Sequence, residues 1–315
     1  MTLTSDTTTQ PLSAGAGVRV IDAHVHLFPP DVLANREAYH QRDGWFEQLY
    51  RDPKARIRTE HELIESMDAS GIAHAIVCGF PWRDPGLCRE HTQWLAALCT
   101  LYPERLSFMG IVSPGAAPHE SGRDAAQAFA LGASAIGELN ADAQGFDLTN
   151  RAQLASLMDA AAAAGRPVML HASEPLGHIY PGKGRSTPDR LLTFLQHFPQ
   201  QPIVLAHWGG GLPFYELMPE VAAATQQVTY DSAASTYLYR RDIWQVALRL
   251  LGPERILFAS DYPVLRQQRL LARTRIDLPA EVQAAVLGDN AARVYRLPTI
   301  GTQPHRPPAE GTRTP

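Results

Sequence analysis

Val20-Ile21-Asp22-Ala23-His24-Val25-His26-Leu27 is an apolar, β-branched run with two histidines one residue apart near its end. Such a run predicts a buried β-strand. Side chains at positions i and i+2 of a strand point to the same side, so we expect His24 and His26 to be presented together. Two neighbouring imidazoles suit one metal ion. An isolated His-x-His pair also occurs by accident in a core or on a surface. The metal-site interpretation therefore depends on whether further ligands follow in the sequence.

Seven more short apolar segments follow, and helix-like segments separate them. The expected strands span residues 72–78, 106–112, 133–139, 167–171, 202–207, 228–231 and 255–261. The expected helices span residues 60–69, 85–101, 118–131, 151–164, 187–198, 214–224, 241–251 and 279–296. Buried strands that alternate with helices indicate a parallel sheet. Eight such units predict a single-domain α/β fold, a (β/α)8 TIM barrel.

The segment between the first strand and the first regular helix is unusual. Residues 29–59 carry several aromatic side chains and no clean periodicity. A connection this long usually has a functional reason. We expect either a partly helical, lid-like insertion after strand 1 or an insertion that packs on the outside. The polar segments 1–17 and 298–315 are expected to be flexible tails, which leaves residues 18–297 as the barrel domain.

Composition narrows the function classes. The 315 residues include 28 basic and 32 acidic ones, a net charge of −4, which gives no general attraction to nucleic acid or a membrane surface. No apolar run is long enough to cross a bilayer, and the first residues lack the features of a signal peptide. The three cysteines are odd in number and lack zinc-site spacing, so we expect reduced thiols in a cytoplasmic protein.

Potential ligands stand at the ends of several expected strands. Glu138, His171, His207 and Asp261 each follow or end an apolar run, as His24 and His26 do. Taken singly, each has an ordinary explanation: a core histidine, a turn residue or an ion-pair partner. In a TIM barrel, however, the carboxyl ends of all strands meet on one rim, where active sites lie. Their joint occurrence there favours a catalytic metal site.

The ordered motifs resemble those of the amidohydrolase superfamily, over residues 19–297. Within it, the chain is similar to the amidohydrolase-related group, which contains aminocarboxymuconate-semialdehyde and resorcylate-type decarboxylases and lactone hydrolases. The resemblance is carried by Asp22-Ala23-His24-Val25-His26, His171, Ala206-His207-Trp208-Gly209-Gly210-Gly211, Ser260-Asp261-Tyr262-Pro263 and Gly288-Asp289-Asn290-Ala291-Ala292-Arg293.

The resemblance implies specific roles. His24, His26 and His171 would bind a divalent metal, with zinc the first expectation, and Asp261 would be both a ligand and the group that handles protons. His207 would polarise a substrate oxygen or orient water. Glu138 has two readings: it resembles the glutamate that bridges two metals in the metal-dependent deoxyribonucleases, or it hydrogen-bonds a ligand histidine. One ion is expected, and two if Glu138 bridges.

The loop after the fifth strand is the first place to seek substrate contacts. It contains His178, Tyr180 and Lys183, which could hold an anionic group above the rim. Further candidates in the other loops are Trp208, Ser232 and the pair Trp82-Arg83. Each could equally be an ordinary loop residue. Together they favour a small, carboxylated or aromatic substrate.

Three functions remain open. The first is a metal-dependent hydrolase that cleaves a C–O or C–N bond of a lactone, ester or amide with metal-activated water. The second is a metal-dependent decarboxylase, a lyase acting on an aromatic or unsaturated carboxylic acid. The third is a non-catalytic barrel scaffold, which the intact ligand set disfavours. A deoxyribonuclease is disfavoured because no basic run is present to bind phosphates. Family habit implies a homodimer.

Overall fold

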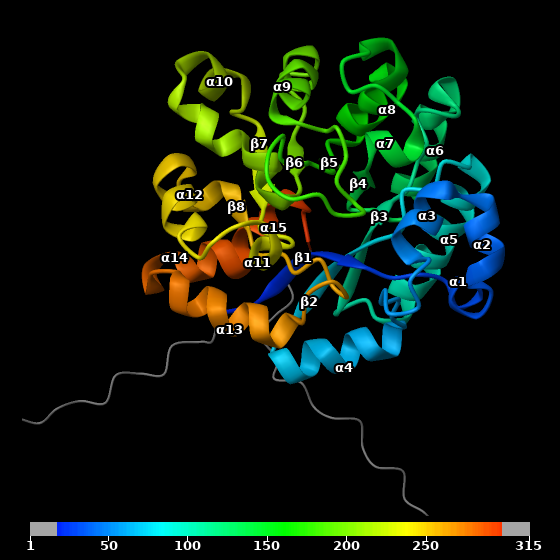
Figure 1. Cartoon of the computed structure of the whole chain (residues 1–315), viewed down its shortest axis with the longest axis horizontal. Helices are drawn as coiled ribbons and strands as arrows, with labels where there is room; N and C mark the ends of the chain where they lie inside the picture. Colours follow the sequence, from blue (N-terminus) through cyan, green and yellow to red (C-terminus); the bar gives the residue numbers. More distant parts are fainter. Residues whose placement is uncertain (1–17, 298–315) are drawn as a thin grey trace, which may run out of the picture.

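A computed structural model describes residues 18–297, which form a barrel of eight parallel strands with helices outside it (Figure 1). The strands pair in chain order. Val25 of the first strand also bridges Tyr262, and Ala23 N donates to Phe258 O, so the last strand segment meets the first and closes the barrel. The strands are β1 Ile21–His26, β2 His74–Cys78, β3 Leu106–Gly110, β4 Ala135–Leu139, β5 Val168–Leu170, β6 Ile203–Leu205, β7 Val228–Asp231 and β8 Ile256–Leu257. The predicted TIM barrel is confirmed.

Two hydrophobic clusters explain why the strands are apolar on both faces. The larger cluster lies between strands and helices and includes Val25 and Leu205. The smaller one lines the inside of the barrel and contains several small side chains, among them Ala23, Ala135 and Ala259. Because both faces are buried, each strand is a continuous apolar run and not an alternating one.

The main helices match the predicted ones closely, because strong caps mark their ends. Thr59 and Glu62 form a capping box at the start of α4, and Gly71 ends that helix with a φ of 69°. The long helices are α4 Glu60–Ser70, α5 Pro85–Leu101, α6 Pro118–Ala130, α8 Arg151–Ala164, α9 Pro188–His197, α12 Ile243–Leu251 and α13 Gln267–Asp277. The last of these was not predicted, because its mixed polar sequence lacks a clear apolar stripe.

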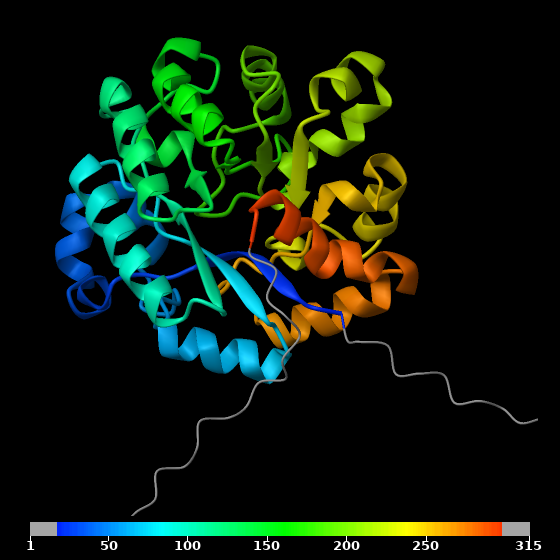
Figure 2. The same ribbon diagram turned by 180° about the vertical axis from the view of Figure 1, so that it is seen from behind.

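Two predicted helical regions are divided in the structure. Residues 207–224 form the 3-10 segment η1 His207–Leu217 and the short helix α10 Pro219–Ala224. The closing region consists of α14 Ala280–Ala284, the π-helical turn η3 Ala285–Asp289 and α15 Asn290–Val294 (Figure 2). A Cβ at Gly288 would lie 2.0 Å from Arg19 O, so only glycine lets this region approach the start of β1 so closely.

The insertion after β1 is partly helical. It contains α1 Pro30–Ala34, α2 Arg36–Arg42 and α3 Gly44–Tyr50. Two further short helices follow other strands: α7 Ala141–Gln144 comes after β4, and α11 Ser235–Leu238 comes after β7. Phe46 of α3 is fully buried and stacks against Phe80 and Trp82. The insertion is thus anchored by an aromatic cluster at the carboxyl end of β1 and β2.

The remaining expectations concern the thiols and the chain ends. All three cysteines are free, as predicted. In the part of the chain that the structure describes, no helix is long and apolar enough to span a membrane. The predicted tails 1–17 and 298–315 lie outside the described residues.

Candidate metal centre

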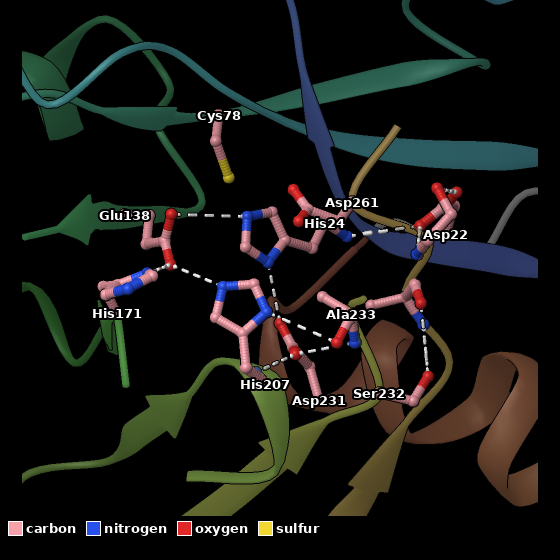
Figure 3. Close-up of polar contacts among 12 residues, drawn as sticks. Asp22, His24, Cys78, Glu138, His171, His207, Asp231, Ser232, Ala233 and Asp261 are labelled. Atoms are coloured by element: carbon pink, nitrogen blue, oxygen red, sulfur yellow. Dashed lines mark hydrogen bonds and ion pairs between the residues drawn. The ribbon is translucent and has the colours of Figure 1, made fainter. Parts of the chain in front are cut away.

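Six side chains predicted from the strand ends converge at one end of the barrel. All of them except His26 are labelled in Figure 3. They come from five different places in the sequence: His24 and His26 from β1, Glu138 from β4, His171 just after β5, His207 at the start of η1, and Asp261 after β8. Their ligand atoms form two groups, in each of which the atoms lie within 4.8 Å of one another.

The first group is His24, His26 and Asp261. His24 Nε2 and His26 Nε2 are 2.9 Å apart, and His26 Nε2 is 3.4 Å from Asp261 Oδ1. The other ring nitrogen of each histidine faces an acceptor: His24 Nδ1 faces Asp231 Oδ2 at 2.9 Å, and His26 Nδ1 faces Gly79 O at 3.2 Å. Those acceptors place the protons on Nδ1, so both Nε2 atoms present lone pairs to each other and to a carboxylate. Such an arrangement needs a cation or a proton between the two nitrogens.

The second group is Glu138, His171 and His207. Glu138 Oε1 is 3.0 Å from His171 Nδ1 and 3.4 Å from His207 Nε2. His207 Nδ1 faces Ala233 O at 3.3 Å, so Nε2 is the ring nitrogen that faces the Glu138 carboxylate. His171 was expected to join His24 and His26 on one ion. In the structure its Nδ1 instead faces Glu138, and its Nε2 lies 3.3 Å from Ser173 Oγ.

Glu138 lies between the two groups. While Oε1 faces His171 and His207, Oε2 is 3.6 Å from His24 Nε2 and 3.7 Å from His26 Nε2. Its side chain is buried, and desolvation alone would raise its pKa, but the charges of His171 and His24 outweigh this and hold the pKa well below the usual value. Glu138 is therefore a buried carboxylate that offers one oxygen to each group.

The electrostatics of the cluster favour positive charge. Burial alone would lower the pKa of His207, but hydrogen bonding and charge from Glu138 raise it to about 9. Burial likewise opposes the charged form of His24, and its electrostatic interactions with Cys78, Glu138 and Asp231 still raise its pKa well above normal. Carboxylates that raise the pKa of buried imidazoles in this way would also hold a cation in place of the protons.

Asp231, the last residue of β7, is a member of the site that the sequence analysis missed. Its fully buried carboxylate accepts from His24 Nδ1, and its Oδ1 accepts from the backbone of His207 at 2.8 Å and of Ala233 at 3.0 Å. It therefore orients one imidazole and fixes the turn that carries another. Its position at the end of an expected strand, like that of the other rim residues, was the sequence feature that could have identified it.

The backbone at two of these residues is unusual. His207 and Asp261 have φ values of 56° and 58°, in the left-handed region that residues other than glycine rarely adopt. Each such residue costs about 1 kcal/mol or more and is found mainly where a side chain has a functional position. The fold thus maintains both side chains at the rim against a local preference.

The donor set as a whole fits a divalent metal ion. Imidazole nitrogens and carboxylate oxygens are ligands for zinc and for other first-row transition metals. The Nε2 lone pairs of His24 and His26, with Asp261 Oδ1 and Glu138 Oε2, surround one common position. Their partners Asp231 and Gly79 hold the two imidazoles in the required tautomer.

The expected substrate contacts lie in different surroundings. Tyr180 is half-buried and donates to Glu174 at 3.2 Å, whereas His178 is exposed beside it. Lys183 Nζ is bonded to the carbonyls of Leu176 and His178 in its own loop.

The other loop candidates serve the packing of the barrel. Trp208 is fully buried, donates to Ser235 Oγ at 2.7 Å and stacks on Trp244, so it offers no surface to a bound molecule. Trp82 is buried in the aromatic cluster, and Ser232 Oγ accepts from Ala259 N. Arg83 is exposed beside Gly145.

Two of the solved structures with a similar fold are decarboxylases of small aromatic acids. A 5-carboxyvanillate decarboxylase of Novosphingobium aromaticivorans, complexed with manganese and 4-hydroxy-3-methoxy-5-nitrobenzoic acid, is 20% identical and has a TM-score of 0.73, covering 89% of this chain and 97% of the other. A dihydroxybenzoic acid decarboxylase of Polaromonas, with manganese and the inhibitor 2-nitroresorcinol, is 17% identical with a TM-score of 0.67, covering 89% and 97%.

A third similar structure is a probable hydrolase. It is a 2-pyrone-4,6-dicarboxylic acid hydrolase of Acinetobacter baumannii, 14% identical with a TM-score of 0.59, covering 88% of this chain and 99% of the other. No curated protein matches the chain at the level of sequence. The amidohydrolase family model, by contrast, matches residues 21–297, which include both ends of the barrel and every member of the two ligand groups. The chain belongs to the amidohydrolase family.

Proposed function

We propose that the protein is a metal-dependent decarboxylase of a small aromatic or unsaturated carboxylic acid. The observation that carries the proposal is the convergence of lone pairs from His24, His26 and Asp261 at the barrel rim. The similarity in fold to decarboxylases that bind manganese supports a lyase more strongly than the hydrolase that the sequence favoured.

One divalent ion would be held by His24, His26, Asp261 and Oε2 of Glu138. Zinc suits these ligands, and the manganese in two similar structures makes manganese the alternative. His171 would then act by holding Glu138 in position and not as a direct ligand. When bound, the ion would supply Lewis-acid character and orient the oxygens of the substrate.

The chain's own groups would handle the proton. Decarboxylation breaks the bond between the carboxylate and a substrate carbon, and that carbon takes up one proton as carbon dioxide leaves. Asp261 stands at the rim with its side chain 12% exposed, and so can carry this proton to the substrate. His207, whose pKa is raised to about 9, would supply positive charge beside the substrate oxygens.

The test is carbon dioxide release from candidate acids. The purified protein is incubated with zinc or manganese and with 2,6-dihydroxybenzoate or 5-carboxyvanillate, the acids named for similar structures. We expect release by the wild type, at least a hundredfold less with Asp261→Asn, and no change with Asp242→Asn, whose side chain is exposed. Release that is equal in the Asp261 and Asp242 variants would contradict the proposed role.

A hydrolase is the second candidate, and the Glu138–His171–His207 group favours it. If His207 gave up its proton, its Nε2 and the Glu138 carboxylate could hold a second ion, with Glu138 between the two. Two ions about 3.5–4 Å apart are typical of hydrolytic centres. Elemental analysis distinguishes the candidates: about one ion per chain supports the decarboxylase, whereas two ions, with cleavage of a pyrone lactone, support the hydrolase.

We also propose a homodimer and a cytoplasmic location. Phe214, Tyr215, Leu217 and Met218 expose apolar side chains on one segment, as subunit interfaces often do. Three free cysteines agree with a reducing compartment. Light scattering on the eluting protein would give the oligomeric state, and a mass of one chain would contradict the dimer.

A further inference from the structure

Two segments from opposite sides of the barrel meet above the candidate metal centre. In a barrel of eight strands in chain order, β1 and β5 are diametrically opposed. Nevertheless α3, which follows β1, lies against the loop that follows β5 (Figure 1). Gln48 Nε2 donates to Pro181 O at 2.5 Å, and a Cβ at Gly182 would lie 3.6 Å from Leu49 Cδ2. A contact between opposite loops must cross the mouth of the barrel.

Of the two segments, α3 is firmly fixed. Phe46 has no exposed surface and packs in the aromatic cluster. The Asp43 carboxylate caps the helix by accepting from the backbone of Trp45 and Phe46, and it also accepts from Arg83 N. Buried packing and a cap shared with a neighbouring loop hold this helix in place.

The facing segment, residues 174–182, is loosely held, and we call it the flap. Leu176 and Ile179 are 80% and 86% exposed. Its side-chain bonds are internal to the loop, with Tyr180 donating to Glu174 and Lys183 Nζ donating to Leu176 O and His178 O. Few buried apolar contacts and much exposed backbone are the features of segments that open locally.

Tyr50, the last residue of α3, lies at this junction. Its ring stacks on Phe28 and Phe46, with centroids 5.3 and 4.9 Å away. Phe28 stands two residues after His26, so this packing places Tyr50 beside the metal centre. Burial raises the pKa of its phenol, and the carboxylates of Asp261 and Glu138 raise it further. Among the described residues the hydroxyl has no hydrogen-bond partner in the protein, and the side chain is only half-buried.

We propose that residues 174–182 are a flap that closes on the fixed helix α3, and that Tyr50 contacts the substrate enclosed beneath it. The Tyr50 hydroxyl would donate to an oxygen of the bound acid, while the ring offers an aromatic face. This part of the inference rests on the proposed function. The movement of the flap does not, because it is argued from the contacts across the mouth and from the exposure and internal bonding of residues 174–182.

Hydrogen exchange measured by mass spectrometry tests the flap without reference to activity. In the full-length protein we expect amides of residues 174–182 to exchange at least a hundredfold faster than those of Phe46 and its neighbours in α3. The Gln48→Ala variant should accelerate exchange in the flap and leave α3 unchanged. Flap amides as strongly protected as those of α3 would overturn the proposal.

A reversible lock then tests whether the flap must open. In the Leu49→Cys/Gly182→Cys variant, oxidation should join the two segments, since Leu49 already contacts the Gly182 position. We expect oxidation to lower turnover at least tenfold and a reductant to restore it, with each single-cysteine variant unaffected. Full turnover in the oxidised double variant would show that substrate enters elsewhere, which would contradict the proposal that the flap must open.

The Tyr50→Phe variant tests the substrate contact, because it keeps the ring and removes only the hydroxyl. We expect kcat/KM to fall about tenfold with metal content and hydrogen exchange unchanged. Tyr237→Phe, at a position 59% exposed, is the matched control. An unchanged kcat/KM for Tyr50→Phe would remove Tyr50 from the site. If the wild type turned over no acid or lactone, the proposed function would be wrong. The hydrogen-exchange rates would still test whether residues 174–182 open, because they do not depend on activity.

Discussion

Asp231 shows how much of the centre depends on a residue that touches no substrate. It orients His24 through Nδ1 and holds the backbone of His207, so a single carboxylate positions one member of each ligand group. Its side chain is fully buried, and the donors around it satisfy both oxygens. An amide at this position would turn an NH2 group toward at least one of those donors.

For Asp231→Asn we therefore expect metal affinity to fall by roughly 10- to 100-fold, the usual effect of removing a carboxylate behind a ligand histidine. Competition with a chromophoric chelator measures the affinity. Asp277→Asn, which breaks a surface pair with Arg241, is the control and should bind metal as the wild type does. Equal affinities for the two variants would show that Asp231 serves folding alone.

At the scale of elements, the turn after β6 explains how His207 reaches the rim. Trp208, Gly209, Gly210 and Gly211 all have left-handed backbone angles, with φ between 56° and 93°. A Cβ at Gly210 would lie 2.4 Å from Ser173 O, so the turn packs its backbone against the loop after β5. Glycine is needed there both for its angles and for the close approach.

Gly210→Ala should accordingly destabilise the protein by about 2–4 kcal/mol, since it combines left-handed strain with a clash against backbone. Urea unfolding measures the effect. Gly132→Ala, also at a positive φ but with open space around its Cβ, separates strain from clash and should cost only about 1 kcal/mol. If the two variants were equally stable, the close approach at Gly210 would not matter.

A buried histidine at the start of β2 makes stability depend on pH. Burial lowers the pKa of His74 from 6.5 to about 4, and its Nδ1 donates to Glu104 O. Between pH 4 and pH 6.5, His74 binds more protons in the unfolded chain than in the folded one. The free energy of unfolding therefore falls as the pH decreases from 6.5 to 4. The resulting change in the free energy of unfolding is about 3 kcal/mol.

Urea midpoints measured between pH 7 and pH 4 test this. The dependence of the urea midpoint on pH should become weaker in His74→Gln, which lacks the titrating group. It should stay unchanged in His61→Gln, since the His61 side chain is 78% exposed. A wild-type slope that survives in His74→Gln would assign the acid sensitivity to other groups.

The sequence predicted the elements that carry the ligands better than it predicted how the ligands are grouped. Continuous apolar strands and glycine-terminated helices such as α8 have strong local signals, so the barrel and the six rim residues could be predicted. The pairing of His171 with Glu138 depends on ring orientations that only the assembled barrel fixes. Asp231 was not predicted because one polar residue that ends a short strand forms no pattern. Trp208 was named as a candidate substrate contact because Trp244, against which it packs, is distant in sequence.

At the scale of the whole molecule, a metal ion bound at the candidate centre would connect the strands of the barrel. Its ligands come from β1, β4 and the segments after β5, β6 and β8, so one ion cluster would link strands on opposite sides of the barrel. Without a cation, the converging lone pairs can be compensated only by protons, as the raised pKa values of His24 and His207 indicate. Metal binding and global stability should therefore be coupled.

Removing the metal should lower the melting temperature by roughly 5 °C or more. An ion present at a hundred times its dissociation constant contributes about 2.7 kcal/mol, and a domain of this size loses about 2 °C for each kcal/mol. Scanning calorimetry before and after dialysis against a chelator measures the shift, and adding zinc or manganese back should reverse it. His26→Ala should melt at the same temperature with and without metal, because it removes a lone pair from the shared position. A wild type that melts identically in both states would mean that the six side chains hold no structural cation, and the barrel would owe its closure to the β8–β1 contacts alone.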